Sequence, residues 1–143
     1  MQILIVNNPM SGLRDGAVFT FIRQLSLPGD EIVLRNIDDI TPISEYVADA
    51  ALFDLVVVAG GDGTISAACY ALRYSGIPIL PFRAGTGNLL VTNLELPDEP
   101  YALAALARQP YMLDFDMGEI TFDNNGASRT RGFTVAAGSC RRS

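Results

Sequence analysis

The stretch that decides the fold is Val56 to Thr64, which reads Val-Val-Val-Ala-Gly-Gly-Asp-Gly-Thr. Its apolar half predicts a fully buried strand over 54–59, of the kind found at the centre of a parallel sheet. A glycine-rich turn follows at once, and a helical pattern begins directly after it. This order is typical of open α/β sheets, which bind ligands at the carboxyl ends of their strands.

Strand and helix patterns alternate on both sides of this stretch. We expect strands over 2–6, 31–35, 54–59 and 77–82, and helices over 15–27, 41–52, 65–75 and 99–108. The alternation predicts a doubly wound, mostly parallel α/β sheet with helices on both faces.

The helical pattern stops at Pro110. Apolar and polar residues then alternate, and the phase of the alternation changes near Gly118, which predicts a β-bulge there. The Asp-Asn-Asn-Gly string at 123–126 is a strong turn signal for a β-hairpin. We therefore expect an α/β nucleotide-binding domain over 1–109 and, over 110–143, the incomplete start of a second, β-rich domain.

The glycine-rich turn suits a phosphate group. Glycines let the backbone come close to a phosphate, and the N-terminus of the following helix carries partial positive charge. Asp62 would repel a bare phosphate, but it fits a ribose hydroxyl or a magnesium ion bound through water. The alternative interpretation is a tight turn in which Asp62 or Thr64 caps the helix.

Two further polar strings follow expected strands. Asn-Asn-Pro-Met-Ser-Gly occupies 7–12, and a Gly-Thr-Gly-Asn string occupies 85–88. Each string alone also reads as an ordinary turn. Together with the glycine-rich turn they supply the candidate nucleotide-binding residues, which are Asn8, Ser11, Gly12, Arg14, Gly60, Gly61, Asp62, Gly63, Thr64, Gly85, Thr86 and Asn88.

The three strings together resemble the diacylglycerol kinase catalytic family, which includes bacterial lipid kinases and sphingosine kinases. The family's Asn-Pro-x-Ser-Gly string corresponds to Asn8–Gly12, its Gly-Gly-Asp-Gly-Thr string to Gly60–Thr64, and its Gly-Thr-x-Asn string to Gly85–Asn88. Asp116-Met117-Gly118 is similar to the Asp-x-Gly that opens the family's second domain. The resemblance spans residues 3 to about 137. Leu89-Leu90 is a departure, because many members have Asp after the asparagine.

The resemblance implies that ATP lies in a cleft between the two domains, with Mg²⁺ as the cofactor. It implies transfer of the γ-phosphoryl group to a hydroxyl of a lipid at the membrane surface, such as diacylglycerol. Asp62 would organise the magnesium-nucleotide, and Asp62 and Asp116 would hold the metal through water. The general base of the family lies in its second domain, and no residue of this chain is assigned to that role.

Composition narrows the classes of function further. The chain contains no histidine, which removes imidazole bases and His-bound zinc, and its net charge of −6 disfavours nucleic-acid binding. No apolar run is long enough for a transmembrane segment, and the N-terminus does not resemble a signal peptide. We expect a cytoplasmic protein, peripheral at the inner membrane surface, whose exposed hairpin edges would allow a homo-oligomer.

Two alternatives stay open from the sequence. An NAD kinase shares the Gly-Gly-Asp-Gly-Thr string, although its later Gly-rich segment and acidic Asn-Glu motif are missing from this chain. The chain could also be a non-catalytic nucleotide-binding or interaction module.

Overall fold

The computed structural model describes residues 1–10, 16–83, 96–97, 99–108, 117–124 and 127–134. The strands are β1 (Gln2–Asn7), β2 (Glu31–Asn36), β3 (Leu55–Gly60), β4 (Ile79–Arg83), β5 (Met117–Asn124) and β6 (Ala127–Thr134). The helices are α1 (Ala17–Leu25), α2 (Ile43–Tyr46), the 3₁₀ helix η1 (Ala50–Leu52), α3 (Asp62–Ala71) and α5 (Pro100–Arg108).

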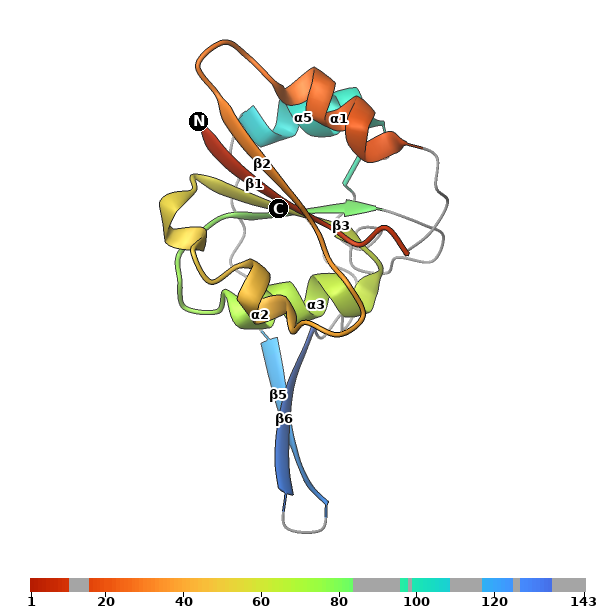
Figure 1. Ribbon diagram of the computed structural model, residues 1–143, viewed down its shortest axis with the longest axis vertical. Coiled ribbons are helices and arrows are strands. Elements are labelled where there is room, and N and C mark those ends of the chain that lie inside the picture. Colours follow the sequence, from red (N-terminus) through yellow and green to blue (C-terminus); the bar gives the residue numbers. More distant parts are fainter. Residues whose placement is uncertain (11–15, 84–95, 98, 109–116, 125–126, 135–143) are drawn as a thin grey trace, which may run out of the picture.

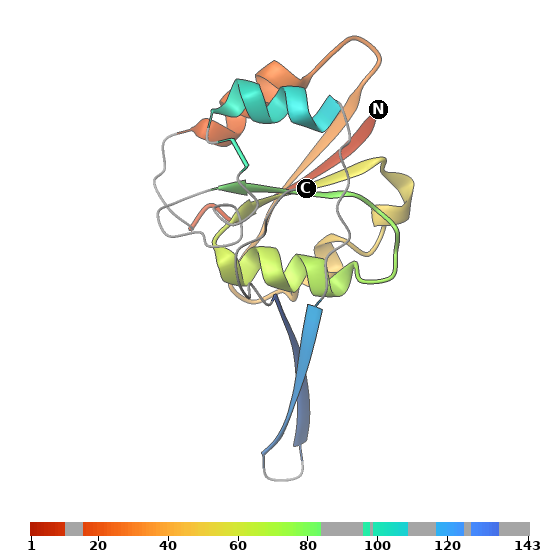
Figure 2. The same ribbon diagram turned by 180° about the vertical axis from the view of Figure 1, so that it is seen from behind.

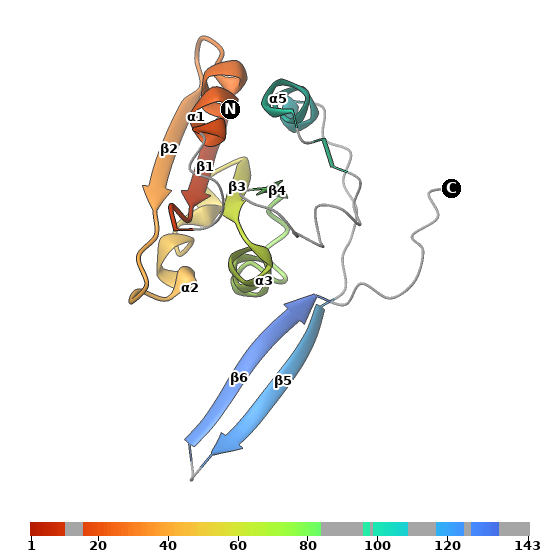
Figure 3. The ribbon, with the colours of Figure 1, turned by 90° about the vertical axis from the view of Figure 1, so that its right-hand side faces the viewer.

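Four strands form a parallel sheet in the order β2-β1-β3-β4 (Figure 1). β3 is buried along its whole length, as its continuous apolar run predicts. The sheet is covered on one face by α1 and α5 and on the other by α2 and α3 (Figure 3). The doubly wound α/β fold expected from the sequence is therefore confirmed.

Alternate residues of the strands supply two separate cores. The core beneath α1 and α5 takes Ile3 and Ile5 from β1, and it includes a tilted pair of rings, Phe21 and Phe82, whose centroids lie 5.2 Å apart. The core beneath α3 takes the intervening β1 residues, Leu4 and Val6. In the described part of the chain no helix combines the length and the apolar character needed to span a bilayer.

The single helix expected over 41–52 is wrong. The chain forms the short α2 and then η1, with non-helical backbone at Val47 and Asp49. Arg35 of β2 explains the break, because its guanidinium donates to both oxygens of Asp49 and to the carbonyl oxygen of Tyr46, all at 2.6 Å. The Tyr46 carbonyl would accept from residue 50 in a continuous helix; Ala50 bonds instead to the Val47 carbonyl.

The hairpin expected near the turn at 123–126 is confirmed, since β5 and β6 pair antiparallel (Figure 2). The bulge expected near Gly118 is wrong. The pairing runs without interruption from Met117 opposite Thr134 to Asn124 opposite Ala127. The change in the apolar–polar alternation near Gly118 needs no bulge, because a regular strand places the apolar Met117 on the same face as the polar Glu119. The proposed boundary between residues 109 and 110 stays a prediction.

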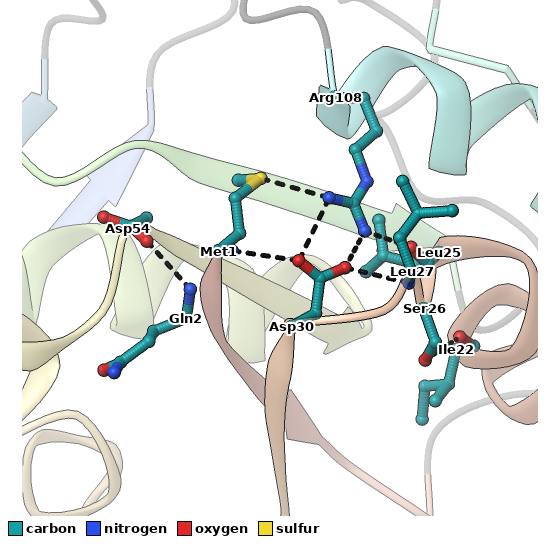
Figure 4. Close-up of polar contacts among 9 residues, drawn as sticks. All are labelled: Met1, Gln2, Ile22, Leu25, Ser26, Leu27, Asp30, Asp54 and Arg108. Carbon is teal, nitrogen blue, oxygen red and sulfur yellow. Dashed lines mark hydrogen bonds and ion pairs between the residues drawn. The ribbon is translucent and has the colours of Figure 1, made fainter.

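Charged groups from separate segments meet at the amino end of the sheet (Figure 4). The Met1 ammonium donates to Oδ1 of Asp30 at 2.9 Å, and the Arg108 guanidinium donates to both oxygens of the same carboxylate. Arg108 also donates to the carbonyl oxygen of Leu25 at the end of α1. The hydrogen bond from Arg108 is the main cause that holds the pKa of Asp30 well below its ordinary value. This cluster ties α1 and α5 to the starts of β1 and β2.

Candidate functional site

Polar residues and a glycine end the four parallel strands. β1 ends at Asn7, β2 at Asn36, β3 at Gly60 and β4 at Arg83. The pairing places Asn7 opposite Asn36 and Gly60 opposite Arg83, so these residues form one edge of the sheet. This carboxyl edge is where open α/β sheets bind their ligands.

The loops after β1 and β3 flank the point where the winding of the sheet reverses. From β1 the chain passes through α1 to β2 on one side, and it then returns to β3 on the other side of β1. The helix α1 covers one face, whereas α3 covers the opposite face. The crevice at such a switch point is the usual ligand site of this architecture.

The turn from β3 to α3 is very short. Gly60 is the last strand residue, Gly61 has extended backbone at φ −80° and ψ 179°, and Asp62 is already helical. The first helical hydrogen bond runs from the Ile65 amide to the Gly61 carbonyl oxygen at 3.1 Å. The amides of the first helical turn have no acceptor inside the helix, and the helix dipole adds positive character at the same end. An anion is therefore stabilised at this position.

The glycines of the turn differ in what they do. A Cβ atom at Gly60 would lie 2.8 Å from Cβ and 2.9 Å from Cγ2 of Thr64, so the packing itself requires glycine there. A Cβ atom at Gly61 or Gly63 would meet nothing within 4 Å among the described residues, and neither glycine has a positive φ. Gly61 and Gly63 are thus required neither by packing nor by backbone conformation in that part of the chain, and they leave space at the start of α3.

Asn8 joins the loop after β1 to this turn. Its backbone amide donates to the Ala59 carbonyl oxygen at 2.8 Å, and its side-chain Nδ2 donates to Oγ1 of Thr64 at 3.1 Å. Its Oδ1 accepts from the amide of Met10 at 3.1 Å, which closes an Asx-type turn. Two of the three polar strings of the sequence are therefore in direct contact. Phosphate binding by Asn8 stays a prediction, because the contacts that are seen hold the two loops together.

Asp62 is half-buried in the first turn of α3. A carboxylate there is favoured by the helix dipole, which is also the simplest structural reason for an aspartate at this position. Within the described ranges no group of three or more His, Cys, Asp or Glu side chains is arranged to hold a metal ion. A metal at this edge would have to be held by one or two carboxylates together with a phosphate ligand and water.

The other candidate residues lie outside the described residues. They are Ser11, Gly12 and Arg14 after β1, Gly85, Thr86 and Asn88 after β4, and Asp116 before β5. β1 and β4 both pair with β3, so the chain leaves each of these strands at the edge where the Gly-Gly-Asp-Gly-Thr turn lies. The roles of these residues stay predictions.

The sequence interpretation missed a pair of asparagines at the same edge. Nδ2 of the buried Asn7 donates to Oδ1 of Asn36 at 3.0 Å, and the Ile37 amide donates to the Asn7 carbonyl oxygen at 2.9 Å. These bonds fix the ends of β1 and β2 beside the candidate site. The available signal was that both expected strands are followed by asparagine, a residue that favours turns.

Comparison with known proteins agrees with this geometry. The model of the diacylglycerol kinase catalytic domain matches residues 2–120. Diacylglycerol kinases from two strains of Mycobacterium tuberculosis are each 36% identical to the chain over 86 residues, which is 59% of this chain and 28% of the relative. The family resemblance expected from the three polar strings is confirmed.

A solved structure has a similar fold. The crystal structure of a diacylglycerol kinase from Bacillus anthracis strain Sterne superposes with a TM-score of 0.61 and 21% sequence identity. The match covers 89% of this chain but 45% of that chain. The chain thus spans less than half the length of the relatives it matches.

Proposed function

Because the chain belongs to the diacylglycerol kinase catalytic domain family, we propose that it forms the nucleotide-binding part of a lipid kinase. The enzyme uses ATP and Mg²⁺ and transfers the γ-phosphoryl group to a lipid hydroxyl, such as that of diacylglycerol. The observation that carries the proposal is the turn from β3 to α3. In the part of the chain that the structure describes, Gly61 and Gly63 leave space there, at a helix N-terminus that favours an anion.

The ATP phosphates occupy the space in front of Gly61 and Gly63. Backbone amides of the first turn of α3 donate to phosphate oxygens, and the absence of side chains at the two glycines permits the close approach. Asn8 and Thr64 hold the loop after β1 beside these phosphates. Donors from Ser11, Gly12 and Arg14 and from Gly85, Thr86 and Asn88 complete the cradle.

The transfer depends on positioning and charge neutralisation more than on covalent chemistry of the protein. The bond between the γ-phosphorus and its bridging oxygen breaks, a bond from the γ-phosphorus to the lipid oxygen forms, and ADP leaves. The hydroxyl proton passes to a general base, a role that we assign to no residue of this chain. Asp62 and Asp116 would hold magnesium through water, and the metal would supply neutralisation of the phosphate charge.

We place the α/β nucleotide-binding domain over residues 1–109. The hairpin of β5 and β6 belongs to the second domain, whose incomplete start we place over residues 110–143. The lipid substrate reaches the cleft between the domains from the membrane surface. This places the enzyme in phospholipid metabolism, in the cytoplasm and peripheral to the inner membrane surface. Within the described residues the hairpin pairs with no third strand, and such edges suit association with a second copy of the chain.

The proposal is tested by measuring transfer of labelled γ-phosphate from Mg-ATP to diacylglycerol in vesicles, using the whole protein that contains this chain. We expect Asp62→Asn to reduce the turnover about 100-fold, because it removes the carboxylate that organises the metal and its water. Asp39→Asn is the matched control, since Asp39 is exposed in the loop after β2. Near-wild-type turnover in Asp62→Asn would overturn the role of this residue.

The acceptor in the same assay separates the alternatives. Transfer to NAD with none to lipid would replace the lipid kinase by the NAD kinase. Binding of Mg-ATP without transfer to either acceptor would favour the non-catalytic nucleotide-binding module.

A further inference from the structure

The hairpin touches the α/β domain at the helix that begins at the candidate phosphate site. The hydroxyl group of Tyr70, near the end of α3, donates to Oε1 of Glu119 on β5 at 2.5 Å. β6 also lies close to α3. The hairpin accordingly projects from the α3 side of the sheet domain (Figures 2 and 3). Tyr70 and Glu119 are 49 residues apart in the chain, so their contact reports how two distant segments are oriented.

The tyrosine ring is contacted by an arginine from the turn that follows α3. The guanidinium carbon of Arg73 lies 3.8 Å from the centroid of the Tyr70 ring, and Nη1 of Arg73 donates to the Tyr70 carbonyl oxygen at 2.8 Å. The hydrogen bond to the Glu119 carboxylate raises the pKa of the Tyr70 phenol, so the phenol stays protonated and can donate at neutral pH. A short hydrogen bond to a charged acceptor is directional as well as strong.

The contact is too exposed to be important for folding. Glu119 lies on the surface, and exposed polar pairs contribute little to the free energy of unfolding. The contact can instead restrict the angle of the hairpin, because a directional hydrogen bond between Tyr70 and Glu119 forms only in some orientations of β5 relative to α3. We therefore expect the contact to matter for the alignment of the hairpin with α3.

One rigid element connects this contact to the candidate phosphate site. Gly63 and Tyr70 are seven residues apart on α3, which places them on the same face of the helix about 10 Å apart along its axis. Ile65 and Ala68 are buried against the sheet and fix the helix between these two positions. A change in the angle of the hairpin at Tyr70 would therefore change the position of the hairpin relative to the start of α3.

We propose that Tyr70 and Glu119 are a positioning pair, which fixes the hairpin relative to α3 so that an acceptor hydroxyl held by the second domain is aligned with the γ-phosphate. This inference rests on the proposed function, because it assigns phosphate binding to the start of α3. Neither residue touches the reacting atoms. Alignment of this kind matters because phosphoryl transfer is sensitive to displacements of about 1 Å.

The kinetic test uses the whole protein with Tyr70→Phe, Glu119→Ala and the double substitution. We expect kcat for transfer to the lipid to fall about tenfold in each single variant, with KM for ATP within about twofold of wild type. The double variant should lose no more than either single variant, because both substitutions break one contact. Tyr74→Phe is the matched control: it removes a phenolic hydroxyl four residues further along the chain, in the turn after α3, from a fully exposed side chain.

A second measurement does not depend on activity. Hydrogen–deuterium exchange of the β5 and β6 amides in the 143-residue chain should be faster in Tyr70→Phe than in wild type, and unchanged in Tyr74→Phe. Unchanged kcat, an additive loss in the double variant or unchanged hairpin exchange would each overturn the proposal. Wild-type protein without kinase activity would overturn the proposed function and the alignment role with it, whereas hairpin exchange would still decide whether the contact orients the hairpin.

Discussion

The two ends of the parallel sheet are built from different chemistry. At the amino end, the Met1 ammonium and the Arg108 guanidinium both bind the carboxylate of Asp30. At the carboxyl end, the contacts of Asn7 with Asn36 and of Asn8 with Thr64 join neutral groups. At the first end the charges are paired with one another, and the second end places two asparagine contacts and the glycines beside Asp62 at the N-terminus of α3.

The difference indicates that contacts at the amino end stabilise the sheet, whereas the carboxyl end is arranged to bind a ligand. Paired charges fix elements in place, but they leave no reason for a further ion to bind. At the N-terminus of α3, Gly61 and Gly63 leave space among the described residues, and the helix dipole favours an anion there in addition to the carboxylate of Asp62. The comparison therefore predicts that substitutions at the amino end change stability alone, and that the glycines of the carboxyl end separate into structural and ligand-binding positions.

The largest effect on stability is expected from Gly60→Ala. The added Cβ would lie 2.8 Å from Cβ of Thr64, so the strand or the helix must move. Overpacking of this kind costs about 1–3 kcal/mol, which urea denaturation of the chain would measure as a lower midpoint. Gly61→Ala is the matched control, and we expect its free energy of unfolding to stay within about 0.5 kcal/mol of wild type. Equal stability of the two variants would remove the distinction between the glycines.

A smaller effect is expected from Asp30→Asn, and it should depend on pH. Since the pKa of Asp30 is lower in the folded chain than its ordinary value of 3.8, its ion pairs stabilise the fold above that value. This contribution is lost as the pH falls toward the folded pKa. At pH 7 we expect the melting temperature of Asp30→Asn to lie a few degrees below that of wild type, and the difference to shrink between about pH 5 and pH 2.

The same variant sharpens the comparison between the two ends. Because Asp30 lies at the end of the sheet opposite the candidate site, Asp30→Asn should bind Mg-ATP with unchanged affinity in a calorimetric titration. A loss of affinity greater than about threefold would show that the two ends are coupled, and a melting temperature difference independent of pH would contradict the ionic account.

Much of the sheet could be predicted because its signals are local. The apolar run of β3 and the glycines after it define a buried strand and a turn without reference to the rest of the chain. The hairpin was predictable for the same reason, since its turn residues lie between the two strands they connect.

The errors have a different origin. The helix expected over 41–52 is interrupted because Arg35 of β2 donates to the Tyr46 carbonyl oxygen and to the Asp49 carboxylate. The spacing of apolar residues within the segment gives no sign of these contacts with a separate strand. The contact of Tyr70 with Glu119 gave no local signal for the same reason.

For the candidate site, the sequence could propose residues but could not assign them separate roles, and the set itself stays a prediction. The sequence treats Gly60, Gly61 and Gly63 alike, because one string contains them all. The structure separates them, since Thr64 packs against Gly60 while the space at Gly61 and Gly63 is open among the described residues. Asn8 was expected at the phosphates, and the contact to Thr64 adds a role that depends on the fold.

The most direct test of the central claim is the melting temperature of the chain with and without Mg-ATP, in wild type and in Gly63→Ala. Without nucleotide we expect Gly63→Ala to be as stable as wild type or up to about 1 kcal/mol more stable, because alanine is favoured over glycine in a helix. With nucleotide at about 100 times its dissociation constant, wild type should gain roughly 2.7 kcal/mol, whereas Gly63→Ala should gain at least about 1 kcal/mol less because the new Cβ enters the phosphate space. An equal gain in both proteins, or no gain in wild type, would contradict binding of ATP phosphates at the start of α3.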